Sequence, residues 1–193
     1  MQRRRLLVLL AGCGMPAGRF AFAAPLADTA LFQRLQAGGH ILLIRHAATA
    51  PGIGDPPGFV LAQCGTQRNL SAGGRRDAQA LGAAVRTHGV PVGRVWSSRW
   101  CRCLDTARLA LGQAEPAPLL DSLFQQDVAE TQARTAALRA RLTAIDHGAN
   151  TALVTHDVNI RALVGLSVAP GEAVAIRAAG GRLDVLGSVW RPD

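Results

Sequence analysis

Two apolar runs in this chain each end in a histidine, and this pattern sets narrow limits on the fold. The first, at residues 40–46, reads His-Ile-Leu-Leu-Ile-Arg-His, and the second, at 151–156, reads Thr-Ala-Leu-Val-Thr-His. Short runs rich in Ile, Leu and Val are typical of parallel strands buried on both faces of a sheet. Ligands of such sheets bind beyond the carboxyl ends of the strands, so His46 and His156 are expected to lie at a ligand site.

Two arginines reinforce this interpretation. Arg45 stands directly before His46, and Arg102 follows a third candidate strand at residues 92–97. A polar residue often does no more than end a strand, but three strand ends with His or Arg favour a function. Two imidazoles and two guanidiniums at one sheet edge predict a site for a phosphate group that is transferred.

Strand and helix patterns alternate along the chain, which predicts a three-layer α/β/α sandwich with a mostly parallel central sheet. Helices are expected at 28–35, 71–88, 106–111, 131–145 and 159–164, and strands at 40–46, 92–97, 151–156, 172–177 and 182–190. Ser71 is the expected N-cap of the second helix, and Gly180-Gly181 the turn between the last two strands. Residues 48–70 show no sustained period, and connections of this length are usually functional.

The composition indicates one globular domain with a small anionic ligand. The chain has 193 residues, 49% hydrophobic and 18% charged, and its net charge is +8. Four of the 21 basic residues lie within the first 19, and the remaining 17 stand against 13 acidic residues. No basic run remains and aromatic content is 4%, so a nucleic-acid partner is not expected. A mild positive field favours a small phosphorylated substrate.

Residues 1–23 have the pattern of a secretory signal peptide, which leaves residues 24–193 as the mature domain. Three arginines precede an apolar stretch, and Ala-Phe-Ala at 21–23 is a cleavage site of the A-x-A type. The arginines also resemble a twin-arginine signal, and Leu-Ala-Gly-Cys at 10–13 matches a lipobox. We expect export, to the periplasm, with contact to a membrane surface only where Cys13 is lipidated.

Export would place the cysteines where a disulfide can form. The mature chain keeps Cys64, Cys101 and Cys103, an odd number in an oxidising compartment. Two alternatives remain: a disulfide from Cys64 to either Cys101 or Cys103, or three buried thiols. Their spacing matches no zinc pattern, and no metal or other cofactor is expected.

Four short segments follow one another in a definite order. They read Arg-His-Ala-Ala-Thr at 45–49, Asn-Leu-Ser-Ala-Gly-Gly-Arg at 69–75, Ser-Arg-Trp-Cys-Arg-Cys-Leu-Asp-Thr-Ala at 98–107 and Thr-His-Asp-Val-Asn-Ile at 155–160. This set resembles the motifs of the histidine phosphatase superfamily, the phosphoglycerate-mutase-like enzymes. The resemblance spans nearly all of the mature chain and implies a phosphoglycerate-mutase-like fold and phosphatase activity.

The resemblance also implies roles for the residues at the sheet edge. His46 is the nucleophile that attacks phosphorus and forms a phosphohistidine. Arg45 and Arg102 bind the phosphate, and His156 binds a transferred oxygen and stabilises the charge that grows on it. Thr49 is a further candidate to bind phosphate through its hydroxyl, or to order the loop around it.

A leaving alkoxide needs a proton from a nearby carboxylic acid. Asp157 is favoured because it follows His156 directly, and one branch of the superfamily uses an H-D pair in this way. Asp121 is the alternative, since it lies roughly where the other branch places its acid. In the long loop, Gln67 and Arg68 are candidates to line the mouth of the site.

The expected activity is that of an exported phosphomonoester phosphatase without the long insertions of the mutases. Residues 98–103 resemble exported bacterial members related to the lipopolysaccharide heptose phosphatases, which favours a phosphate on an envelope saccharide or lipid. Two alternatives are kept: a phosphohistidine protein phosphatase, and a non-catalytic phosphate-binding envelope module.

Overall fold

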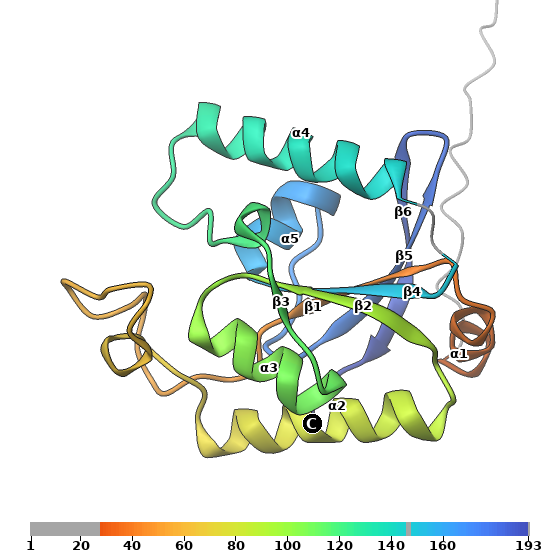
Figure 1. The fold of residues 1–193 in the computed structure, drawn as a ribbon, viewed down its shortest axis with the longest axis horizontal. Coiled ribbons are helices and arrows are strands. Elements are labelled where there is room, and N and C mark those ends of the chain that lie inside the picture. The colour runs from red at the N-terminus through yellow and green to blue at the C-terminus, as the bar shows by residue number, and fades with distance from the viewer. Residues whose placement is uncertain (1–27, 146–147, 193) are drawn as a thin grey trace, which may run out of the picture.

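A six-stranded sheet lies between helices in the computed structural model of the chain (Figure 1). The structure describes residues 28–145 and 148–192, so the expected signal segment 1–23 and Cys13 lie outside the described residues. The strands are β1 (Ile41–Arg45), β2 (Val92–Ser97), β3 (Glu115–Pro116), β4 (Asn150–Thr155), β5 (Ala173–Ala179) and β6 (Arg182–Trp190). The helices are α1 (Asp28–Gln36), α2 (Ala72–Thr87), α3 (Cys101–Leu111), α4 (Val128–Ala144) and α5 (Asp157–Val164), with short 3₁₀ turns η1 (Cys64–Thr66) and η2 (Pro118–Leu120).

The sheet is mixed, so the expectation of a mostly parallel sheet is only partly right. Its order is β3-β2-β4-β1-β5-β6, and the first four strands are mutually parallel. Strand β5 runs antiparallel to β1, and β6 antiparallel to β5. Only Gly180 and Gly181 separate β5 from β6, both with positive φ, and a two-residue connection can join antiparallel strands only.

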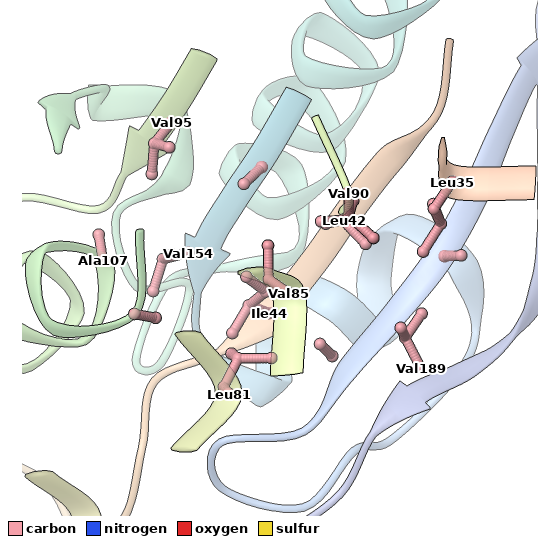
Figure 2. Packing of buried hydrophobic residues seen from close by; sticks show 14 of the residues in the cluster. Leu35, Leu42, Ile44, Leu81, Val85, Val90, Val95, Ala107, Val154 and Val189 are labelled. Carbon is pink, nitrogen blue, oxygen red and sulfur yellow. The ribbon is translucent and has the colours of Figure 1, made fainter. Parts of the chain in front are cut away.

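Two apolar cores hold the layers together, one on each face of the sheet. Leu42 and Ile44 of β1 pack with residues of α1, α2 and α3 in the core that Figure 2 shows. Ile41 and Leu43 pack into the opposite core, with residues of α4 and α5. Successive side chains of a strand point to opposite faces, so the first run is buried on both sides, as its composition predicted. The three-layer arrangement is confirmed.

Most element boundaries agree with the expected ones within a few residues. Ser71 caps α2, and its hydroxyl accepts a hydrogen bond from the Gly74 amide at 3.0 Å. The largest difference is α3, which begins at Cys101, five residues before the expected start. Trp100 at its N-cap makes no side-chain hydrogen bond to the helix, so the usual polar start signal is missing there. The early start places Arg102 in the first turn of α3, directly beyond the end of β2.

Within the two described ranges, no helix has the length and apolar character that crossing a membrane requires.

Candidate active site

The carboxyl ends of three parallel strands meet around one cavity. His46 follows β1, His156 follows β4, and Arg102 lies just after β2; all three line a cavity of about 710 Å³. The two imidazole ring centroids are 5.3 Å apart in an edge-to-face arrangement. The structure therefore brings together both predicted histidines and, with Arg45, both predicted arginines.

His46 is buried and held in one orientation. Its Nδ1 lies 2.9 Å from the Ala47 carbonyl oxygen, and only a protonated nitrogen can donate to that oxygen. In the neutral ring, Nε2 then carries the lone pair. Burial lowers the pKa of His46 from 6.5 to about 3; the Ala47 hydrogen bond opposes this, and the positive charges of Arg102, Arg45 and Arg68 add to it. The ring is thus neutral at physiological pH, which is the state a nitrogen nucleophile needs.

His156 is buried beside it, at the N-cap of α5. Its Nε2 is 2.9 Å from the Ser98 hydroxyl and 3.5 Å from the Cys103 sulfur. Burial, followed by the charges of His46 and Arg102, holds the pKa of His156 well below its usual value. Burial also raises the pKa of the Cys103 thiol to about 12. Cys103 therefore stays protonated and is unsuited to be the nucleophile.

Three guanidinium groups line the cavity. Besides Arg45 and Arg102 these include Arg68, which was only a candidate for the mouth. Each of the three has a buried Nε atom with no hydrogen-bond partner among the described residues. Because these Nε atoms are inaccessible, a bound anion would meet the terminal nitrogens of the three groups, whose charges suit an anion with several acceptor oxygens.

Asp55 is the charged cavity residue that the sequence patterns did not reveal. Its carboxylate accepts from Arg102 Nη1 at 2.7 Å, from Trp100 Nε1 at 2.9 Å and from the Arg68 amide at 2.9 Å. Burial alone would raise the pKa of Asp55, but these hydrogen bonds, that from Arg102 first, hold it below its usual value. Asp55 therefore stays ionised. It fixes one edge of the Arg102 fork and leaves a net positive charge in the cavity.

Thr49 lies outside the lining of the cavity and acts on it through Arg68. Its hydroxyl accepts a hydrogen bond from Arg68 Nη1 at 2.8 Å, so the structure gives Thr49 the loop-ordering position, without contact to the cavity. Gln67 is buried and also outside the lining, and its Oε1 accepts from the Cys101 amide at 3.0 Å. Of the two loop residues that were candidates for the mouth, only Arg68 reaches it.

The two candidate acids lie in different surroundings. Asp157 lines the cavity, and its Oδ1 accepts from the Val168 amide at 3.0 Å. Asp121 is buried outside the lining, where it accepts from the backbone amide of Arg99 at 2.9 Å and from its Nε at 2.7 Å. Asp157 is therefore the one of the two that lines the cavity. Among the described residues, no group of His, Cys, Asp and Glu is arranged to hold a metal ion.

A disulfide joins the long loop to the start of α3. The pairing is Cys64 with Cys101, and Cys103 is free and buried, which decides among the alternatives that the sequence left open. The bond connects residues 37 apart in sequence and lies next to Arg102. It ties the loop that carries Asp55 and Arg68 to the helix that carries Arg102.

Loss of this disulfide is expected to destabilise the fold. A cross-link of this span stabilises a protein by about 4 kcal/mol, mainly because it restricts the unfolded chain. We expect reductant, or Cys101→Ser, to lower the free energy of unfolding by that order in urea titrations. Reductant should leave the stability of the Cys101→Ser variant unchanged. An equal loss in wild type and variant on adding reductant would show that the bond is not its cause.

The burial of His46 also predicts how stability depends on pH. Its pKa is depressed in the folded state, so its contribution is complete above the unfolded value of 6.5 and is lost as the pH falls. Between pH 6.5 and about pH 5, we expect a loss of up to about 1.4 kcal/mol per pH unit from this residue. The free energy of unfolding, measured in urea at several pH values in this range, should fall less steeply with decreasing pH in His46→Asn than in wild type. An unchanged pH dependence in His46→Asn would contradict a lowered pKa at His46.

Comparisons with known proteins agree with this geometry. The family model of the histidine phosphatase superfamily (branch 1) matches residues 41–125. A comparison with curated protein sequences finds no match. The solved alpha-ribazole phosphatase from Shigella flexneri is 19% identical, with a TM-score of 0.59, and the match covers 78% of this chain and 96% of that one.

Two further solved structures share the fold. The protein histidine phosphatase SixA complexed with tungstate has a TM-score of 0.54 at 16% identity, and covers 77% of this chain and 95% of its own. Phosphoserine phosphatase from Entamoeba histolytica, in complex with 3-phosphoglyceric acid, has a TM-score of 0.59 at 12% identity, and covers 79% and 97%. The chain therefore has the fold of these phosphatases and matches the histidine phosphatase family model over residues 41–125, and together these findings support a phosphatase.

Proposed function

We propose that this chain is an exported phosphomonoester phosphatase that works through a phosphohistidine at His46, on a phosphate carried by an envelope saccharide or lipid. The observation that carries the proposal is a neutral, buried His46 whose cavity is also lined by the guanidinium groups of Arg45, Arg68 and Arg102. A phosphomonoester supplies both an electrophilic phosphorus and the oxygens that these donors need.

The reaction follows in two balanced steps. In the first, the Nε2 lone pair of His46 attacks phosphorus, the N–P bond forms, and the bond from phosphorus to the ester oxygen breaks. The leaving oxygen takes a proton from a carboxylic acid, for which Asp157 is the candidate at the cavity. In the second, water attacks phosphorus, its proton returns to that carboxylate, and His46 leaves as the neutral imidazole. Arginines and His156 hold the phosphoryl oxygens throughout.

Export rests on residues 1–23, which have a positive start, an apolar stretch and an A-x-A site. The Cys64–Cys101 disulfide supports it, because structural disulfides persist mainly in oxidising compartments. Lipidation at Cys13 is the alternative fate of the leader and would place the same domain on a membrane surface. Intact mass of the protein from a membrane fraction distinguishes the two.

The experiment that tests the proposal is a phosphoenzyme trap. Mature protein is mixed briefly with a radiolabelled aryl phosphate and quenched in alkali, because phosphohistidine is stable there and labile in acid. We expect acid-labile label on the peptide that contains His46. Absence of label and of hydrolysis, from folded protein across a range of pH, would overturn the proposal in favour of a phosphate-binding module.

The acid is tested by comparing leaving groups. Asp157→Asn should slow the hydrolysis of alkyl phosphates by about 10²-fold or more, because an alkoxide leaves poorly without a proton. Aryl phosphates leave more readily and should be affected much less. Asp121→Asn serves as the matched comparison at the alternative position. Equal slowing of both ester types in Asp157→Asn, or an alkyl-selective effect in Asp121→Asn, would reject Asp157 as the acid.

A further inference from the structure

Beside its charged residues, the cavity has an apolar wall, which consists of Ile53, Phe59, Trp100, Phe124 and Val158. Trp100 joins the two regions: its Nε1 donates to Asp55, and its ring lies edge-on to His156 with centroids 5.5 Å apart. The Trp100 ring also meets Phe59, with centroids 5.9 Å apart. Phe59 and Val158 also line the cavity, so the apolar surface begins directly beside the phosphate-binding groups.

Two large hydrophobic side chains stand exposed at this wall. Ile53 is 92% exposed and Phe124 is 49% exposed, and both line the cavity. They come from different loops that lie together, since a Cβ built on Gly54 would be 3.8 Å from Cε1 of Phe124. Large apolar groups gathered at one exposed place usually mark a binding surface.

The loop that carries Phe124 is held in place. The buried Asn159 accepts from the Leu123 amide at 3.1 Å and donates to the Asp121 carbonyl at 2.8 Å. Gln125 has φ of 71°, the one positive φ outside glycine in the described part of the chain. Such strain persists where the surroundings enforce it, and it is often found at ligand sites. Phe124 is thus presented to the cavity by a fixed backbone.

We infer that this wall is the subsite for the leaving group, and that it selects phosphomonoesters of apolar alcohols, alkyl chains above all. This inference rests on the proposed function and, of the two substrate classes named there, favours the lipid over the saccharide. The cavity volume of about 710 Å³ suits a whole small molecule and far exceeds what a phosphate group fills. Ile53 offers no hydrogen bond and no aromatic face to a sugar, whereas an alkyl chain gains from burial against it.

A polyol is the alternative occupant, because Ser122, Gln125 and Gln126 also line the cavity. The alkyl and polyol classes make opposite predictions. Each methylene that enters an apolar subsite should tighten binding about fourfold, whereas a polar subsite gains nothing from it.

The test measures binding of ethylphosphonate and hexylphosphonate to the wild-type protein by calorimetry, since phosphonates are not hydrolysed. We expect hexylphosphonate to bind at least about tenfold more tightly. Phe124→Ser and Ile53→Ser should each reduce this ratio by about fivefold, with ethylphosphonate unchanged. Val128→Ser is the matched control, because Val128 is 73% exposed on the same segment but outside the cavity lining.

The second measurement compares the hydrolysis of hexyl phosphate with that of glucose 6-phosphate. The two substrates are matched, because each has six carbons and releases a primary alkoxide. A higher kcat/KM for hexyl phosphate is expected. Equal binding of the two phosphonates, or a preference for glucose 6-phosphate, would overturn the apolar subsite while leaving a phosphatase. Tight hexylphosphonate binding without hydrolysis of any phosphate would instead overturn the proposed function and leave the subsite standing.

Discussion

Replacing His46 by alanine is expected to reduce kcat by roughly 10⁴-fold or more and to remove the trapped phosphoenzyme. The reason is that the covalent route has no substitute nucleophile nearby: His156 is engaged through Nε2 by Ser98, and burial keeps the Cys103 thiol protonated. Binding of inorganic phosphate should persist, because the cavity arginines remain. The measurement is steady-state hydrolysis of an aryl phosphate beside phosphate binding by calorimetry.

The control for His46→Ala is His88→Ala. His88 stacks on Phe32, with ring centroids 3.7 Å apart, and lies outside the cavity lining, so its loss should leave kcat unchanged. Far-UV circular dichroism of both variants shows that each is folded. A His46→Ala protein that is folded, binds phosphate and turns over within tenfold of wild type would reject His46 as the nucleophile.

The parts of the site that the sequence predicted are those that follow directly from a strand. His46 and His156 are adjacent to buried apolar runs, and parallel strands bring their carboxyl ends to the same edge, so their meeting needs no further information. The same reasoning located Arg102, even though α3 starts earlier than expected. The direction of β5 beside β1 was less predictable, because an apolar pattern states which face is buried and not which way the strand runs. The Gly180-Gly181 turn then makes β6 antiparallel to β5.

Asp55 and Arg68 illustrate what sequence reasoning missed or left undecided. Asp55 meets Arg102 across 47 residues of chain, and it does so from an irregular loop without periodicity. The path of that loop depends on the Cys64–Cys101 disulfide and on Gln67, which are tertiary contacts. One general signal was present: a buried arginine needs an acceptor, and Asp55 is the one acidic residue in the long connection at residues 48–70.

The second large effect is expected for Arg102→Ala, in both stability and activity. The side chains of Arg102 and Asp55 are each only 6% exposed, and their contact is 2.7 Å long. Removing the arginine leaves a buried carboxylate without its counter-charge, which typically costs about 3–5 kcal/mol. The matched control is Arg75→Ala, whose pair with Asp105 is at the surface and worth at most about 1 kcal/mol. Urea unfolding compares the two.

Activity separates the two roles of Arg102, as a partner of Asp55 and as a ligand of phosphate. We expect Arg102→Ala to lower kcat/KM by about 10³-fold and to abolish inhibition by inorganic phosphate, because a charged donor to the transferred group is lost. Asp55→Asn keeps that donor and removes one negative charge from the cavity, so phosphate inhibition should strengthen while kcat falls. If Arg102 were only structural, both variants would lose stability together and neither would change phosphate inhibition in the folded protein. Opposite shifts in phosphate inhibition therefore assign Arg102 to the ligand and Asp55 to the positioning of Arg102.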